Sequence, residues 1–89
     1  MLKITRVTIS DRDITLKLDG SVAGQWVELL RITTETIFQE GVELTLDLSN
    51  VNFIDCDGST VVKNLLKRGA RQVNAPLYVA ELISGCKED

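Results

Sequence analysis

Apolar and polar residues alternate along two short segments at the start of the chain, as they do in half-buried β-strands. The segments cover residues 2–9 and 14–18, and turn-forming residues lie between them, so they are predicted to pair as a hairpin. The alternation slips by one position at Thr5-Arg6, which predicts either a β-bulge or the twist of an edge strand there. The alternating apolar positions are Leu2, Ile4, Val7, Ile9, Ile14, Leu16 and Leu18.

The spacing of the apolar residues then lengthens from two positions to three or four, which is the period of an amphipathic helix. This pattern covers residues 22–38 and returns over residues 59–72, so two helices are predicted. Gly41 follows the first helix, where a left-handed terminal residue is expected. The second helix is expected to end at Asn74-Ala75-Pro76, because proline cannot continue a helix.

Two further strands are predicted from the remaining apolar positions. Residues 42–48 alternate between apolar and polar side chains, and Leu77 to Ala80 form a short apolar run. The resulting order is β-β-α-β-α-β, in which helical crossovers make the joined strands parallel and the initial hairpin adds an antiparallel edge. We therefore expect a single small α/β domain over residues 1–89, with a mixed four-stranded sheet covered by helices and a short C-terminus.

Composition and charge narrow the classes of function. With 89 residues, 44% of them hydrophobic, the chain is predicted to be one globular domain. A net charge of −3 gives no electrostatic basis for binding nucleic acid. No apolar run approaches the roughly 20 residues that span a bilayer, and the first residues resemble a strand more than a signal peptide. A cytoplasmic protein that does not insert into the membrane is expected.

The residue types available for catalysis are few. The chain has no histidine, which removes the commonest general base and the histidine-containing zinc sites. Cys56 and Cys86 do not have metal-ligand spacing and are expected to be reduced thiols. We therefore expect no metal and no other cofactor.

An acidic turn lies between the third predicted strand and the second helix, at a position where α/β domains commonly bind charged groups. Asp57 is expected to cap the helix, which is worth about 1 kcal/mol over alanine. Asp55 is expected to accept hydrogen bonds from loop N–H groups. Cys56 is either a redox-sensitive thiol, because the start of a helix lowers the pKa of a cysteine, or an inert small residue, which the neighbouring carboxylates favour. The turn consists of Asp55, Cys56, Asp57 and Gly58, and Ser59 and Thr60 follow it.

Three stretches of the chain resemble STAS domains, a family named after sulfate transporters and anti-sigma factor antagonists. They are Leu18-Asp19-Gly20, the segment from Leu46 to Gly58 with its Asp-Leu-Ser and acidic turn, and the segment from Pro76 to Ala80. The resemblance covers nearly the whole chain. It implies a non-enzymatic regulatory module, similar to bacterial anti-sigma factor antagonists, that binds a protein partner in signalling and transcription regulation. The implied partner is an anti-sigma factor or a related kinase.

The turn departs from the family pattern at the residue before its glycine. In phosphorylatable STAS domains a hydroxyl residue there accepts phosphate from the partner kinase, whereas this chain has Asp57. We hypothesise that the phosphorylation site is lost. One carboxylate carries less charge than a phosphate, so charge alone does not decide which state of the serine Asp57 resembles. Ser59 and Thr60 are fallback acceptors, although they are expected to belong to the first helical turn.

The resemblance also implies where a partner binds. The turn from Asp55 to Thr60 and the exposed face of the second helix are the candidate surface. That face is predicted to carry the basic residues Lys63, Lys67 and Arg71, which are either partner contacts or simply solvated. STAS domains usually continue into another helix after the last strand, and the sequence leaves open whether residues from Glu81 onward replace it.

Several alternatives remain open. Small STAS proteins also serve as subunits of bacterial lipid-transport ATPase complexes, and the short length and the missing phosphorylation site fit that role. A homodimer formed through an edge strand is a third option. The turn also resembles the first motif of haloacid-dehalogenase-type phosphatases, with Asp55 as nucleophile and Asp57 as acid/base beside Mg²⁺. That chemistry needs further polar residues on later strands, and only one clear strand is predicted after Gly58. A calcium loop is disfavoured because the required bidentate glutamate is absent.

Overall fold

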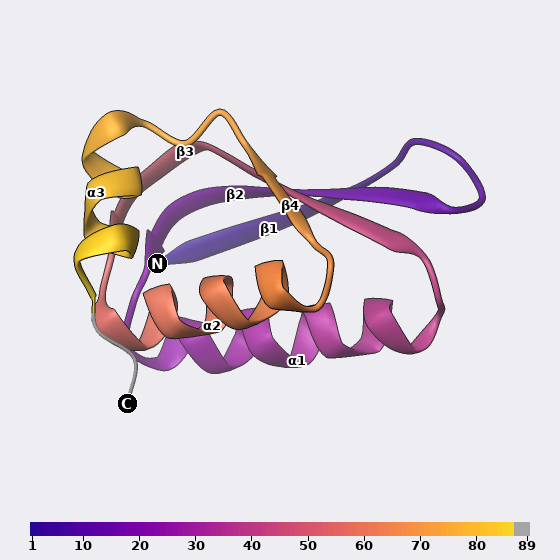
Figure 1. Cartoon of the computed structure of the whole chain (residues 1–89), viewed down its shortest axis with the longest axis horizontal. Helices are drawn as coiled ribbons and strands as arrows, with labels where there is room; N and C mark the ends of the chain where they lie inside the picture. The colour runs from indigo at the N-terminus through magenta and orange to yellow at the C-terminus, as the bar shows by residue number, and fades with distance from the viewer. Residues whose placement is uncertain (87–89) are drawn as a thin grey trace.

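The computed structural model describes residues 1–86, which form a four-stranded sheet and three helices (Figure 1). The order of elements follows the prediction through the fourth strand and then adds a helix. In chain order the elements are β1 (Leu2–Thr8), β2 (Asp13–Val22), α1 (Gln25–Gln39), β3 (Glu43–Ile54), α2 (Cys56–Lys67), β4 (Arg71–Val73) and α3 (Leu77–Gly85).

The sheet has the mixed topology that the sequence predicts. Its strands lie in the order β1-β2-β3-β4, with β1 antiparallel to β2 and the two other pairs parallel. Helices α1 and α2 lie side by side along one face of the sheet, and α3 lies at the end where β3 leads into α2 (Figure 1). The two longest connections from strand to strand therefore pass through helices that cover the same face.

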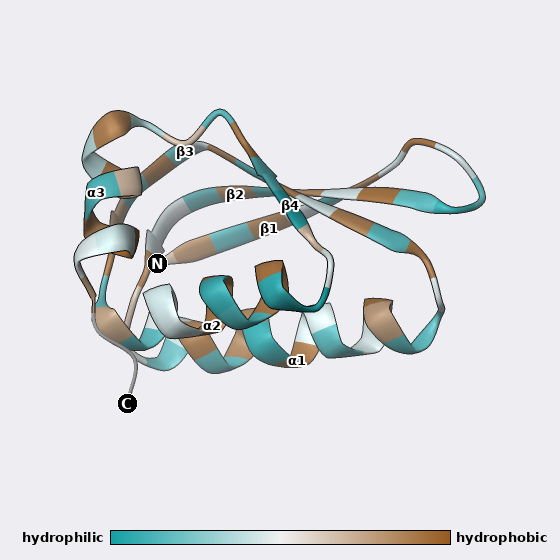
Figure 2. Cartoon of the chain, viewed as in Figure 1, coloured by the Kyte–Doolittle hydropathy of each residue, from teal (hydrophilic) through white to brown (hydrophobic). Residues whose placement is uncertain are grey.

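The core lies between this face of the sheet and the two helices. Every second residue of β2 and β3 is buried along the alternating segments, which confirms the predicted period of two. Hydrophobic residues recur along these strands and on α1 and α2 (Figure 2). Side chains with no exposed surface come from all four elements: Leu16 and Leu18 of β2, Leu30 of α1, Leu46 of β3 and Val62 of α2.

Of the two expected causes of the slip at Thr5-Arg6, the bulge is wrong, because β1, an edge strand of the sheet, pairs with β2 in unbroken register from Leu2 to Thr8. The slip in the apolar pattern has another cause. Val7 and Ile9, at and just after the end of β1, are 41% and 64% exposed. The hairpin of β1 and β2 extends past the helices at this end (Figure 1). Where a strand end has no core beneath it, its apolar and polar residues need not alternate. Irregular register occurs instead between β2 and β3, after Lys17 and after Gly20.

Both helices begin and end at residues other than those predicted. Helix α1 begins at Gln25, because β2 continues through Val22. Helix α2 begins at Cys56 and ends at Lys67, so it starts and stops earlier than the predicted span 59–72. Its end is set by Gly69, which adopts a positive φ of 103° that side chains other than glycine rarely tolerate.

The predicted strand from Leu77 to Ala80 is also wrong, since these residues begin helix α3. The fourth strand is instead Arg71–Val73, which pairs with Thr45–Asp47 of β3. A short apolar run fits a buried strand and a buried helix equally well, so the pattern did not distinguish them. The buried residues Val79 and Ile83 are four positions apart, which is the helical spacing. A helix thus follows the last strand within the described residues.

Candidate functional site

Asp55 fixes the start of helix α2. Its backbone is extended (φ −89°, ψ −179°), and its Oδ1 accepts a hydrogen bond of 2.7 Å from the backbone N–H of Gly58. Its Oδ2 accepts a second bond, of 2.9 Å, from the backbone N–H of Gly24, which precedes α1. Asp55 is therefore the N-cap of α2 and also holds the loop between β2 and α1. The expectation that Asp55 accepts bonds from loop N–H groups is confirmed.

Asp57 does not cap the helix, so the expected cap at this residue is wrong. It is the second residue of α2 and an exposed acidic group of the first turn. There its carboxylate interacts favourably with the positive end of the helix dipole. It lines an open hollow of about 360 Å³ at the starts of α1 and α2. The other residues of this hollow are Gly24, Val27, Glu28, Thr60 and Val61.

Gly58 is required by a close approach between helix α2 and strand β2. A Cβ atom added to Gly58 would lie 2.4 Å from the backbone oxygen of Val22 and 2.9 Å from Cγ1 of Ile54. No side chain fits in that space without moving the backbone of β2. The glycine of the acidic turn therefore allows the first turn of α2 to pack directly on the end of β2.

The two hydroxyl residues after the turn differ in accessibility. Ser59 is 1% exposed, and its Oγ has no hydrogen-bond partner among the described residues. A kinase would have to open the first turn of α2 to reach it. Thr60 is half-buried and borders the hollow beside Asp57. Both belong to the early turns of α2, as expected, and Ser59 is poorly placed as a fallback phosphate acceptor.

Cys56 and Cys86 form a disulfide, so the expectation of two reduced thiols is wrong for this structure. The bond joins the first residue of α2 to the residue that follows α3, across a Cα–Cα distance of 5.6 Å. Cys56 is exposed and Cys86 is buried. In addition, the Lys63 ammonium group donates a hydrogen bond to the backbone carbonyl of Cys86. The sequence did not predict the pairing because α3 was not predicted.

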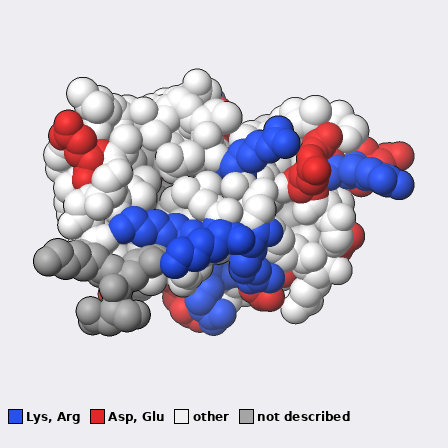
Figure 3. All heavy atoms as spheres, viewed as in Figure 1, with Lys and Arg blue, Asp and Glu red and all other residues white. Residues whose placement is uncertain are grey.

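The predicted basic stripe does not lie on one helix. Lys63 and Lys67 belong to α2, but Arg71 lies in β4, because α2 ends before it. Basic side chains nevertheless gather in a band over α2 (Figure 3). Lys63 is half-buried and binds the end of α3, so it is a structural contact as well as a candidate for partner binding.

Arg68, just after α2, joins that helix to α1. Its guanidinium group donates bonds of 2.6 and 3.3 Å to the two carboxylate oxygens of Glu35. It also lies 4.3 Å from the centre of the Phe38 ring. The bond from Arg68 lowers the pKa of the Glu35 carboxyl group below its usual value. Arg68 is thus a structural link between the helices.

Polar residues of the STAS-like motifs link β2 to β3. Asn50 donates a bond of 2.7 Å to Asp19, and Ser21 donates one of 2.8 Å to Asn52. In the Asp-Leu-Ser segment, the backbone N–H of Ser49 donates a bond of 3.0 Å to Asp47. This bond, with further bonds from the side chains of Ser49 and Asn74 and the charge of Lys17, lowers the pKa of Asp47. These motif residues therefore hold the strand ends that carry the turn.

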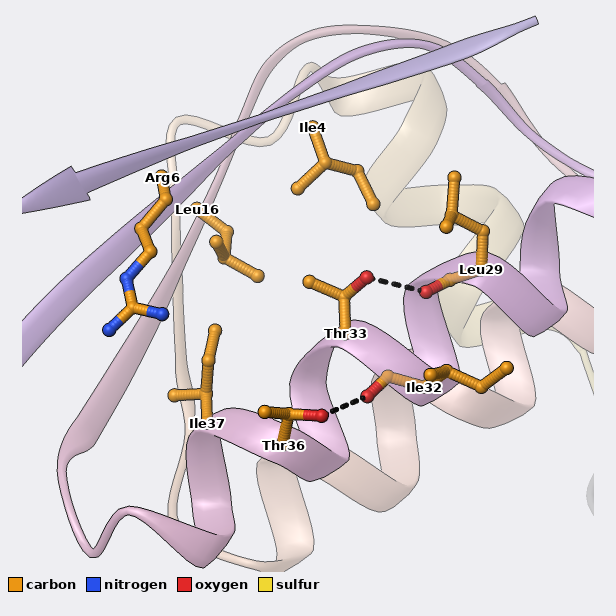
Figure 4. A pocket seen from close by; sticks show the side chains of 8 residues that line it. All are labelled: Ile4, Arg6, Leu16, Leu29, Ile32, Thr33, Thr36 and Ile37. Atoms are coloured by element: carbon orange, nitrogen blue, oxygen red, sulfur yellow. Dashed lines mark hydrogen bonds between the residues drawn. The ribbon is translucent and has the colours of Figure 1, made fainter.

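One hollow was not predicted from the sequence. An apolar groove of about 460 Å³ lies between β1, β2 and α1 (Figure 4). The hydroxyl groups of Thr33 and Thr36 donate to the carbonyls of Leu29 and Ile32 in their own helix. The threonine methyl groups thus add to an apolar lining. The residues around the groove are Ile4, Arg6, Leu16, Leu29, Ile32, Thr33, Thr36 and Ile37.

The described residues contain no cluster of three or more histidine, cysteine or acidic side chains that could bind a metal ion. Within residues 1–86, no helix has the length and apolar character needed to cross a membrane.

The fold matches solved structures of anti-sigma factor antagonists. The anti-sigma factor antagonist SpoIIAA in its unphosphorylated form aligns with a TM-score of 0.76 at 19% identity, over 93% of this chain and 79% of that chain. An antisigma-factor antagonist, a STAS domain from Rhodobacter sphaeroides, aligns with a TM-score of 0.68 at 18% identity, over 88% of this chain and 95% of that chain. No protein-family model and no curated protein sequence matches the chain. The fold is that of a STAS domain, as the sequence resemblance implied.

The geometry also bears on the phosphatase alternative. A nucleophilic carboxylate needs an oxygen that faces the substrate. Both oxygens of Asp55 instead accept bonds from backbone N–H groups at the starts of two helices. This arrangement favours a structural role for Asp55 and leaves Asp57 as the exposed acidic group of the turn.

Proposed function

We propose that this chain is a non-enzymatic regulatory domain of the anti-sigma factor antagonist type, which binds a cytoplasmic protein partner through the start of helix α2. The observation that carries the proposal is the exposed carboxylate of Asp57 in a STAS fold. The sequence resemblance places Asp57 where phosphorylatable STAS domains have their acceptor serine. In this chain, that position carries a constant negative charge in place of a switchable one.

The charge around Asp57 indicates what kind of partner group it binds. Asp57 and Glu28 line the same open hollow of about 360 Å³, and because Arg31 already forms an ion pair with Glu28, Asp57 is the carboxylate that a partner would meet. Such a surface favours a lysine or arginine side chain of the partner, and the attraction should weaken as salt concentration rises. An anti-sigma factor or related kinase is the proposed partner. A lipid-transport ATPase subunit is the rival.

The test is affinity purification of the full chain from its native host, followed by binding measurements with the purified partner. Asp57→Ser and Asp57→Ala are compared with Asp11→Ser, which removes an exposed aspartate at the hairpin tip. We expect both changes at Asp57 to alter the dissociation constant by more than about threefold, and the control to leave it unchanged.

The direction of the change assigns the role of Asp57. Weaker binding by Asp57→Ser identifies a direct contact, whereas tighter binding identifies a carboxylate that imitates phosphate and disfavours the partner. An unchanged dissociation constant contradicts the proposed role of the turn. Recovery of an ATPase of a lipid transporter as the partner would favour the rival function, and a self-associating chain without a partner would favour the homodimer.

A further inference from the structure

The disulfide lies directly beside the proposed partner-binding turn. Cys56 is adjacent to both Asp55 and Asp57, and it ties the start of α2 to the end of α3. We propose that Cys56 and Cys86 form a redox-sensitive modification site that controls the docking of α3 and, with it, binding at the turn. The effect on binding rests on the function proposed above, whereas the effect on α3 does not.

Apart from the disulfide, α3 is held by non-covalent packing against α2 and β3. The helix has nine residues, which is shorter than the roughly 12 to 15 residues that an isolated helix needs to be even marginally stable. No side chain caps its start, and its buried residues are Val79 and Ile83. Beyond these contacts, Lys63 binds the carbonyl of Cys86, the same residue that makes the disulfide. Loss of the covalent bond therefore leaves α3 held by a short apolar contact and the bond from Lys63.

The bond is accessible to a reductant. Cys56 is exposed at the surface, whereas Cys86 is 7% exposed. An open hollow of about 390 Å³ borders both cysteines and lies between the end of β3 and α3. The other residues around this hollow are Phe53, Ile54, Asp55, Glu81, Leu82 and Gly85.

The reaction is exchange with a dithiol, such as a thioredoxin-type protein or dithiothreitol. A thiolate of the dithiol attacks Sγ of Cys56, forms a mixed disulfide and expels the Cys86 thiolate, which takes up a proton. The second thiol of the reagent then attacks the reagent's other sulfur atom, which is bonded to Cys56 in the mixed disulfide. This step forms the reagent's internal disulfide and releases the Cys56 thiolate, which takes up a proton. Two electrons pass to the protein, and the dithiol is oxidised. In a reducing compartment, disulfides of this kind are usually transient and redox-sensing.

The oxidised form should bind the partner more tightly, because α3 is then fixed beside the turn before binding. In the reduced form, α3 separates from α2 and β3 more often, and the partner must select or reorder the docked arrangement. Preorganisation of a binding surface raises affinity by removing this cost. We expect reduction to weaken binding by about fivefold or more, the lower range of coupling between two sites.

Two readouts separate this inference from the proposed function. The first is amide hydrogen exchange of residues 77–85, measured without a partner in the oxidised chain and in dithiothreitol, with thiol labelling and mass spectrometry to confirm each state. We expect exchange in α3 to increase at least about tenfold on reduction, and the free energy of opening of α3 to fall below that of the core strands β2 and β3. Equal exchange in the two states overturns the inference, whatever the partner does.

The second readout is partner affinity in both redox states, with Cys86→Ser as the matched variant. This variant should bind as weakly as the reduced chain and should not respond to dithiothreitol. If it fails to fold, the reduced wild-type chain gives the same comparison. Faster exchange in α3 with unchanged affinity overturns the control of binding. Faster exchange together with no effect of Asp57→Ser supports the redox site and contradicts only the proposed function.

Discussion

The two acidic residues of the turn should differ sharply in their contribution to stability, although they are two positions apart. Asp55→Ala removes the acceptor for Gly58 N–H at 2.7 Å and for Gly24 N–H at 2.9 Å. Loss of a helix cap costs about 1 kcal/mol. A further hydrogen bond to a charged group contributes about 1.5 kcal/mol at the lower end of its range, which suits the exposed bond to Gly24. The free energy of unfolding should therefore fall by about 2.5 kcal/mol.

Asp57→Ala is the matched control. Asp57 is exposed and lies in the first turn of α2, where the helix dipole gives a carboxylate about 0.3 to 1 kcal/mol. Removal of this side chain should cost no more than that. Both variants lose one negative charge and gain an alanine. The difference between their free energies of unfolding therefore reports the two hydrogen bonds of Asp55.

Urea unfolding followed by the fluorescence of Trp26 measures both variants, since this residue lies at the start of α1 close to Gly24. We expect the urea midpoint of Asp55→Ala to fall with an unchanged slope, and its melting temperature to drop by about 10 °C or more for a domain of this size. Equal destabilisation by the two substitutions, or a loss below about 1 kcal/mol for Asp55→Ala, would show that the cap assignment is wrong.

Three further outcomes are expected. Gly58→Ala should lower the free energy of unfolding by about 1 to 3 kcal/mol, because the new Cβ would lie 2.4 Å from the backbone oxygen of Val22. Gly85→Ala, whose new Cβ would meet nothing within 4 Å, is the control, and similar urea midpoints for the two variants would refute the reasoning. Reduction of the Cys56–Cys86 bond, whose cysteines are 30 positions apart, should destabilise the chain by about 3 to 4 kcal/mol by chain entropy, and calorimetry with and without dithiothreitol checks this. Hydrogen bonds lower the pKa of Asp47 below its usual 3.8, so the carboxylate stabilises the fold above that pH, and this contribution is lost as the pH falls through the folded-state pKa. Wild type should exceed Asp47→Asn in stability near neutral pH and lose that advantage in acid; a difference independent of pH would contradict this linkage.

The sequence predicted most of the sheet because β2 and β3 have one buried face. Apolar and polar residues alternate along these strands because every second side chain packs against the helices. Prediction failed where that condition is absent. The end of β1 extends past the helices, and the apolar run at Leu77 fits a strand or a helix. The short strand Arg71–Val73 is exposed along its length, so it has no alternating pattern to detect.

The sequence predicted that the acidic turn leads into the second helix, but it predicted only part of the geometry of the turn. The acidic turn does open helix α2, and Asp55 is a structural acceptor. Which aspartate caps the helix depends on the first helical residue, and a helix boundary is uncertain by one or two positions in any sequence pattern. The disulfide could not be predicted because it joins α2 to the unpredicted helix α3. The apolar groove depends on how α1 lies against β1, which no local pattern encodes.

The double role of Asp55 constrains how homologous sequences can diverge. One side chain serves the starts of two helices, so its replacement loses the bonds to Gly24 and Gly58 together. Gly58 in turn has no space for a larger residue, and Gly24 has a positive φ of 60°. Each of residues 24, 55 and 58 should therefore resist substitution in descendants of a common ancestor, while the exposed residue 57 between them should vary more readily.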